Sequence, residues 1–188
     1  GTDTSYYPSG CPYSSQSFLL GNPHGISTTY FDSTFRVKTQ IEHYMGRVHG
    51  SYIEYDAAGD TIKFQDFANN LPNGVKKEYY AESKIKKISH YQNGLLHGCQ
   101  IRFAENGNKE LAISYYEGKK DGDWIYYFDN QKTASNNFWT FGTATGPPVL
   151  ASSLTDETFA KDAYTYTMVA TGSPSGFAAF GLPSGLTV

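Results

Sequence analysis

Glycine recurs through this chain at a nearly constant spacing. Gly25, Gly50, Gly74, Gly98 and Gly122 follow one another every 24 residues, apart from one extra residue between the first two, and Gly1 and Gly146 extend the series. A period between about 20 and 50 residues is typical of stacked repeats, because one such unit cannot bury an apolar face by itself. The spacing therefore predicts a repeat protein whose functional residues lie on a surface and not in a pocket.

Aromatic residues keep the same register as the glycines. Five residues after the repeat glycine stand Tyr6, Tyr30, Tyr55, Tyr79, Phe103 and Tyr127. Seven residues before the next glycine stand Phe18, His43, Phe67, Tyr91, Tyr115 and Trp139. Each unit is therefore expected to supply two ring positions to the packing between repeats.

Turn residues and alternating segments complete the unit. Four residues before the repeat glycines come Gly21, Gly46, Asn70, Gly94, Gly118 and Gly142, all types that accept a positive φ. A second turn is expected near Gly10, Gly59 and Gly107, with weaker signals at Ser83 and Gln131. Because the segments between these turns alternate apolar and polar residues, each repeat predicts one β-hairpin. The predicted fold is all-β, an elongated single antiparallel sheet of about six stacked hairpins.

Two segments resemble a known repeat. The patterns Tyr91-x-x-Gly94-x-x-x-Gly98 and Tyr115-x-x-Gly118-x-x-x-Gly122-x-Trp124-x-x-Tyr127 resemble the MORN repeat in its bacterial MORN-variant form, and looser copies extend the resemblance over residues 1–146. The resemblance implies an elongated, twisted sheet of stacked hairpins. It implies no catalytic residues, because such proteins are regarded as scaffolds, adaptors, membrane-associated modules or antitoxins.

The repeat pattern is expected to stop at a pair of prolines. Pro147 and Pro148 lack the N–H that a strand ladder needs, so residues 147–188 form a separate C-terminal tail. The tail predicts a short helix over residues 153–164 and a strand over residues 164–170. Two roles stay open: a cap on the sheet, or a strand that adds to the edge of the next molecule and builds a head-to-tail filament.

The composition describes a soluble protein with a thin core. Of the 188 residues 39% are hydrophobic, the formal net charge is −3, and no apolar run approaches the roughly 18 residues of a membrane-spanning helix. This charge predicts no nucleic-acid partner. A local basic cluster is expected to be a solvated strand face and not a phosphate or lipid patch. It comprises Lys76, Lys77, Lys84, Lys86 and Lys87.

The two cysteines, Cys11 and Cys99, lie in the first and fifth repeats. Two strands of about 4.8 Å per repeat place them roughly 40 Å apart, and a disulfide needs Cα atoms within about 7 Å. We therefore expect no intrachain bond, while intermolecular pairing stays open. The abundance of Tyr, Ser, Thr, Gly and Asn favours an extracellular or cell-surface protein, with a signal peptide removed before Gly1 left open and a cytoplasmic protein as the alternative.

The histidines before three repeat glycines do not predict a metal site. His24, His49 and His97 occupy equivalent positions, which adjacent repeats place about 10 Å apart, whereas zinc needs nitrogens at about 2.0 to 2.1 Å. They are expected to be turn residues, and the glycines are likewise attributed to turns. No Gly-x-Ser-x-Gly elbow or phosphate-binding loop is present in the sequence. The sequence therefore predicts no enzyme, catalytic residue, cofactor or metal.

Five aromatic residues beside the repeat ring positions are the candidates for binding: Tyr52, Tyr80, Trp124, Tyr126 and Phe128. If several share one face, they form a stripe suited to a protein partner or to sugar rings. The expected function is a non-enzymatic scaffold for protein–protein interaction, and its most specific form is an extracellular structural subunit that binds itself head to tail. The alternatives are an intracellular antitoxin or immunity-like binder and a glycan-binding module.

Overall fold

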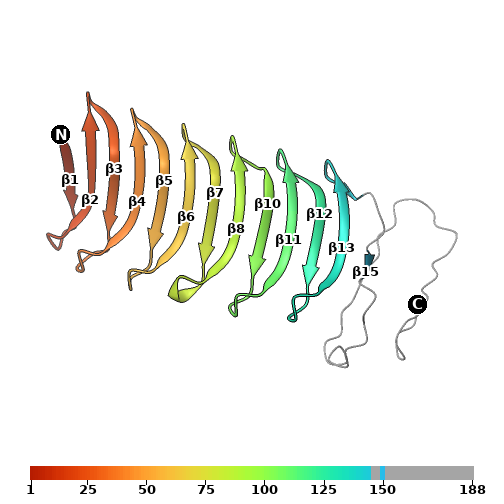
Figure 1. Ribbon diagram of the computed structural model, residues 1–188. Coiled ribbons are helices and arrows are strands. Elements are labelled where there is room, and N and C mark those ends of the chain that lie inside the picture. Colours follow the sequence, from red (N-terminus) through yellow and green to blue (C-terminus); the bar gives the residue numbers. More distant parts are fainter. Residues whose placement is uncertain (145–148, 151–188) are drawn as a thin grey trace. The chain divides into compact units, whose positions relative to one another are not determined.

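A single antiparallel sheet contains the whole described chain. The computed structural model describes residues 1–144 and 149–150, and the strands β1 to β8 and β10 to β14 follow one another across the sheet in chain order (Figure 1). The short strands β9 and β15 pair with β8 and β13. The predicted all-β fold of stacked hairpins is confirmed. The predicted tail helix and strand, at residues 153–170, lie outside the described residues.

The strands are mostly five to nine residues long. They are β1 (Thr2–Tyr6), β2 (Pro12–Leu19), β3 (Asn22–Tyr30), β4 (Val37–Tyr44), β5 (Arg47–Tyr55), β6 (Thr61–Ala68), β7 (Leu71–Tyr79), β8 (Ile85–Gln92), β9 (Leu95–Leu96), β10 (Gly98–Phe103), β11 (Lys109–Tyr116), β12 (Lys119–Tyr127), β13 (Thr133–Thr140), β14 (Thr143–Ala144) and β15 (Val149–Leu150). One 3₁₀ turn, η1 (Ala81–Ser83), joins β7 to β8.

Six two-residue turns line one side of the sheet, at the top of Figure 1, and we call this side the turn edge. In chain order the turns are Leu20-Gly21, Met45-Gly46, Asn69-Asn70, Asn93-Gly94, Glu117-Gly118 and Phe141-Gly142. Both residues of every turn have positive φ, which is the type I′ geometry that matches the twist of paired strands. The predicted turn positions are confirmed.

Backbone hydrogen bonds stack these turns on one another. From the second turn onward, the second turn residue donates its N–H to a carbonyl of the preceding repeat, at distances of 2.7 to 2.8 Å, as Gly94 does to Pro72. Each turn is therefore tied to its neighbour as well as to its own hairpin.

The opposite side, which we call the loop edge, carries longer connections. Asp56 N–H, for example, donates to the carbonyl of Asp60 at 2.9 Å, and Gly59 N–H donates back to Asp56 at 3.1 Å. The predicted positions Gly10, Gly59, Ser83, Gly107 and Gln131 all have positive φ and are confirmed as turn residues. In the second repeat the closing bond joins Phe31 N–H to the carbonyl of Arg36, one residue further along. This longer loop absorbs the extra residue that interrupts the glycine period.

The repeat glycines lie inside strands, which corrects the expectation that they mark turns. Gly74 in β7 pairs with Tyr91 in β8, and in the same way each repeat glycine pairs across the strands with the second ring position of its own repeat. These glycines have positive φ and stand where the register shifts against the preceding strand. The two periodic signals of the sequence are therefore cross-strand partners at a β-bulge.

The expectation that three histidines are turn residues is also wrong. His24 lies in β3 and His49 in β5, and His97 directly precedes β10, so none of them is a turn residue. Their rings pack against tyrosine: the centroid of Tyr44 lies 5.4 Å from His24 and 6.1 Å from His49, and His97 lies 5.0 Å from Tyr116.

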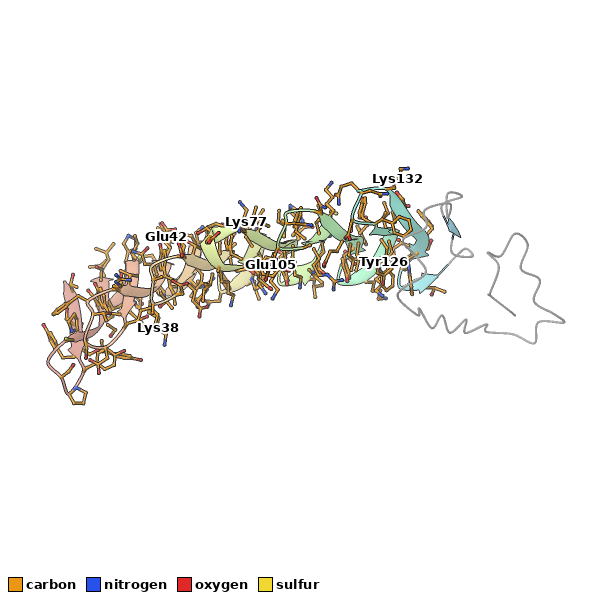
Figure 2. The ribbon with its side chains drawn as sticks, turned by 90° about the horizontal axis from the view of Figure 1, so that it is seen from below. Lys38, Glu42, Lys77, Glu105, Tyr126 and Lys132 are labelled. Carbon is orange, nitrogen blue, oxygen red and sulfur yellow. The ribbon has the colours of Figure 1, made fainter. Side chains whose placement is uncertain are left out.

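The two faces of the sheet differ in chemistry. The glutamine face is the side that carries, in cross-strand register, Tyr52, Gln65, Lys76, Ser89, Gln100, Ile113 and Trp124. The isoleucine face is the opposite side, with Ile53, Phe64, Lys77, Ile88, Ile101, Ala112 and Ile125. Side chains project from both faces (Figure 2). Among the described residues only Ile113, Gln65 and Ser89 are buried, which confirms the thin core.

The cysteines lie far apart in the strand order. Cys11 belongs to the loop before β2 and Cys99 to β10, so β2 to β8 lie between them, and both thiols are free. Burial raises the pKa of the Cys99 thiol, and the nearby Lys109 offsets part of that increase.

Candidate protein-interaction surface

The five predicted binding aromatics do not form one stripe. Tyr52, Trp124 and Tyr126 belong to the glutamine face, but β6, β7, β8, β10 and β11 lie between Tyr52 and the other two. Tyr80 and Phe128 lie at the loop edge, at the starts of the loops after β7 and β12. The structure thus brings together only Trp124 and Tyr126.

Tyr80 has an internal role. Its hydroxyl donates a hydrogen bond of 3.0 Å to the carbonyl of Phe103, one repeat further along. Tyr7 makes the equivalent 2.8 Å bond to Tyr30. These tyrosines therefore hold neighbouring repeats together at the loop edge.

Trp124 belongs to a cation–aromatic cluster. The ammonium of Lys120 lies 3.4 Å from the Trp124 ring centroid and 4.6 Å from that of Trp139, while Tyr126 stacks on Trp124 at 5.8 Å. Burial lowers the pKa of Lys120, and the π electrons of the two indoles compensate the partly desolvated charge. The Lys120 ammonium and the Tyr126 ring therefore both lie against the Trp124 indole.

Tyr52 lines a shallow depression of about 280 Å³ with Lys63, Gln65, Phe67, Pro72, Lys76 and Tyr91. The Tyr52 hydroxyl donates to the Glu54 carboxylate at 3.0 Å, and the Lys63 ammonium lies 5.0 Å from the ring centroid. Burial, together with the hydrogen bond to Glu54 and its charge, raises the pKa of Tyr52 to about 12. The two lysines that line the depression already have partners, since Lys63 lies over the Tyr52 ring and Lys76 pairs with Glu78, so the depression resembles packing more than a ligand site.

The basic cluster is divided between the two faces. Lys76 and Lys87 lie on the glutamine face beside Glu78, and the Lys76–Glu78 ion pair measures 2.6 Å. Burial alone would raise the pKa of Glu78, but the hydrogen bond to Lys76 and the lysine charges lower it. Lys77 lies on the isoleucine face, and Lys86 lies 5.3 Å from the centroid of the Tyr80 ring. These lysines therefore do not form a single patch.

Within the described residues no group of three or more His, Cys, Asp or Glu side chains is arranged to hold a metal ion. The same part of the chain contains no helix long and apolar enough to cross a membrane.

An exposed apolar row along the turn edge is the feature that the sequence analysis missed. Every one of the six turns carries at least one bulky apolar side chain that is 42 to 85% exposed. We call this set of eight residues the apolar turn row: Leu19, Leu20, Tyr44, Met45, Leu71, Leu95, Tyr116 and Phe141.

The apolar residue changes its position from turn to turn. It stands within the turn at Leu20, Met45 and Phe141, before the turn at Leu19, Tyr44 and Tyr116, and after it at Leu71 and Leu95. The 24-residue period does not reveal the row, because no single position of the repeat is apolar in every repeat. The signal in the sequence is instead one apolar residue within two positions of every two-residue turn.

Comparisons with known proteins leave the family open. No family model matches the chain, and no curated protein matches it. Among solved structures, one similar chain is a mutant of Staphylococcus aureus TarM in complex with fondaparinux, alpha-GlcNAc-glycerol and UDP, with 16% sequence identity and a TM-score of 0.36. The match covers 52% of this chain and 19% of that one, so the chain spans about a fifth of the length of the TarM chain.

Proposed function

We propose that this chain is a non-enzymatic repeat scaffold that binds protein through the apolar turn row. The observation that carries the proposal is the presence of bulky side chains at strained turn positions. Leu20, Met45 and Phe141 have φ values of 49°, 47° and 47°, a region that large side chains rarely occupy. Asn93 fills the same position at φ 50°, with the residue type that such turns prefer.

The strain is not compensated by burial within the sheet. Leu20 is 85% exposed and Phe141 is 62% exposed, so these side chains gain little from packing in the free protein. A left-handed backbone costs a residue other than glycine about 1 to 2 kcal/mol. Strained and exposed apolar residues together are typical of a binding surface, because a partner can supply the burial that the fold does not.

The turn edge has the regularity of a scaffold. Its six turns are tied by backbone hydrogen bonds between repeats, so they form a preorganised linear array. A rigid surface loses little conformational entropy on binding, which favours affinity. The resemblance to MORN-variant repeats is consistent with this role.

The experiment replaces Leu20, Met45 and Phe141 together with Asn, the residue that their backbone conformation favours. We expect the triple variant to unfold at the same or a higher temperature than the original chain, and to lose binding of proteins from the cell that produces it. Phe35→Asn is the matched control, since Phe35 has φ 54° and is 66% exposed on the loop edge. A set of bound proteins that is lost in Phe35→Asn and kept in the triple variant contradicts the proposal.

A further inference from the structure

The apolar turn row contains one thioether, that of Met45. Met45 is the first residue of the second turn, with φ 47°, and it is 43% exposed. The preceding residue, Tyr44, is 61% exposed and packs against His24 and His49. Peroxides convert an accessible methionine thioether to the sulfoxide, which is polar. The exposure of Met45 therefore makes it a candidate for oxidation in the folded protein.

The fold accepts a polar side chain at the position of Met45. Three other turns carry one there, at φ values of 47 to 51°: Asn69, Asn93 and Glu117. The second turn is tied to the preceding repeat by the bond from Gly46 N–H to the Pro23 carbonyl, which measures 2.8 Å and involves backbone atoms alone. A sulfoxide at Met45 therefore leaves the turn and its stacking intact.

Oxidation changes what this turn offers to a partner. A sulfoxide oxygen accepts hydrogen bonds, so burying it in a dry contact without a donor is unfavourable. Leu20 and Phe141, which occupy the equivalent turn position, carry no sulfur. Among the eight residues of the row, the apolar character of Met45 is thus the one that thioether chemistry can remove and restore.

On these grounds we propose that Met45 is a site of reversible oxidation, and that its sulfoxide weakens protein binding by the apolar turn row while the sheet stays folded. The inference rests on the proposed function. A sulfur lone pair attacks one oxygen of hydrogen peroxide, the S–O bond forms as the O–O bond breaks, and the peroxide is reduced to water. Methionine sulfoxide reductases reverse the change with two thiols, which become a disulfide.

The test treats the full-length chain with hydrogen peroxide at neutral pH and follows oxidation by mass spectrometry of timed digests. Met168, which lies outside the described residues, is replaced by leucine in every chain compared. Met45 is expected to oxidise as fast as methionine in an unstructured peptide. The matched control is Met45→Leu combined with Ile113→Met. It moves the thioether to a position that is 6% exposed, where oxidation is expected to be at least about tenfold slower.

Three measurements on the oxidised chain separate its surface from its fold. Retention on a phenyl column at high ammonium sulfate is expected to fall, and the unfolding temperature is expected to change by less than about 2 °C. The amount of protein captured from the producing cell is expected to fall at least about threefold. Met45→Leu, treated in the same way, contains the same cysteines and should show none of these losses. Methionine sulfoxide reductases should restore both retention and capture.

Three results overturn the inference: oxidation of Met45 as slow as that of the buried methionine, unchanged retention, or a larger fall of the unfolding temperature. Capture distinguishes this inference from the proposed function. If oxidation leaves capture unchanged while the triple Asn variant loses it, the oxidation site does not regulate binding and the proposed scaffold function stands. If neither treatment changes capture, both are wrong.

Discussion

The carboxylate of Asp66 accepts a hydrogen bond of 3.0 Å from the backbone N–H of Val75, beside the left-handed Gly74. Glu42 makes the equivalent 3.0 Å bond to Ser51, beside Gly50. The carboxylate occupies the space that a side chain at the repeat glycine would need: a Cβ added to Gly74 would lie 2.8 Å from the Cβ of Asp66. Glycine is thus required at Gly50 and Gly74 both by its own φ and by the acid that accepts the hydrogen bond at the bulge.

Gly74→Ala is expected to destabilise the sheet by about 1 to 3 kcal/mol, because it adds a steric overlap to a left-handed backbone. The matched control is Gly107→Ala, which has φ 86° but no atom within 4 Å of the added Cβ. Chemical denaturation of both variants measures the difference. An equal loss of stability in both would show that the overlap with Asp66 is unimportant.

Asp66→Ala is expected to lower the free energy of unfolding by about 1 to 3 kcal/mol, since it removes a charged acceptor from the Val75 N–H. Asp66→Asn retains an acceptor oxygen and should lose less. Denaturation curves for the two variants test this order. If Asn is as harmful as Ala, the negative charge and not the acceptor oxygen is what the bulge requires.

Tyr52 is expected to make the protein sensitive to alkaline pH. Its pKa is about 12 in the folded chain, against 10.0 for an unperturbed tyrosine. Between these values the folded state holds the proton more strongly than the unfolded state, so the free energy of unfolding falls as pH rises. Tyr52→Phe removes this contribution, and its stability should fall less steeply over the same pH interval. Parallel slopes for the two proteins would contradict the assignment.

Tyr80→Phe is expected to lower stability by about 1 kcal/mol, because it removes the hydroxyl that bonds to the Phe103 carbonyl. Partner binding through the turn edge should be unchanged. The measurement is thermal unfolding beside the capture experiment described above. Loss of partner binding in Tyr80→Phe without loss of stability would show that Tyr80 belongs to the binding surface after all.

Cys99 is expected to react slowly with iodoacetamide near neutral pH, because its raised pKa leaves less of the reactive thiolate than in an unperturbed cysteine. Mass spectrometry of timed digests measures its rate against a free cysteine peptide. A rate equal to that of the peptide would contradict the raised pKa. A Cys11–Cys99 link in a non-reduced digest would contradict the linear order of strands.

Much of the fold could be predicted because local chemistry repeats. Gly21, Gly46 and Gly94 predict turns that need positive φ, and the alternation of apolar and polar residues around Ile53 predicts a half-buried strand. The role of Gly74 could not be read in the same way, because its need for glycine arises from Asp66 on the neighbouring strand. For the same reason the sequence could not show which candidate aromatics lie close together. Tyr52 and Trp124 share a face, but β6, β7, β8, β10 and β11 lie between them, and only the order of strands in the sheet reveals this.

The sequence by itself determined the period, the hairpins and the single sheet, since each depends on residues close together in the chain. The tertiary structure alone decided which side chains meet across strands and which remain exposed. It paired each repeat glycine with a ring, placed Lys120 over Trp124, and gathered Leu20, Met45 and Phe141 on one edge. The physical reason is that cross-strand contacts and exposure depend on the stacking of repeats, which no single repeat encodes.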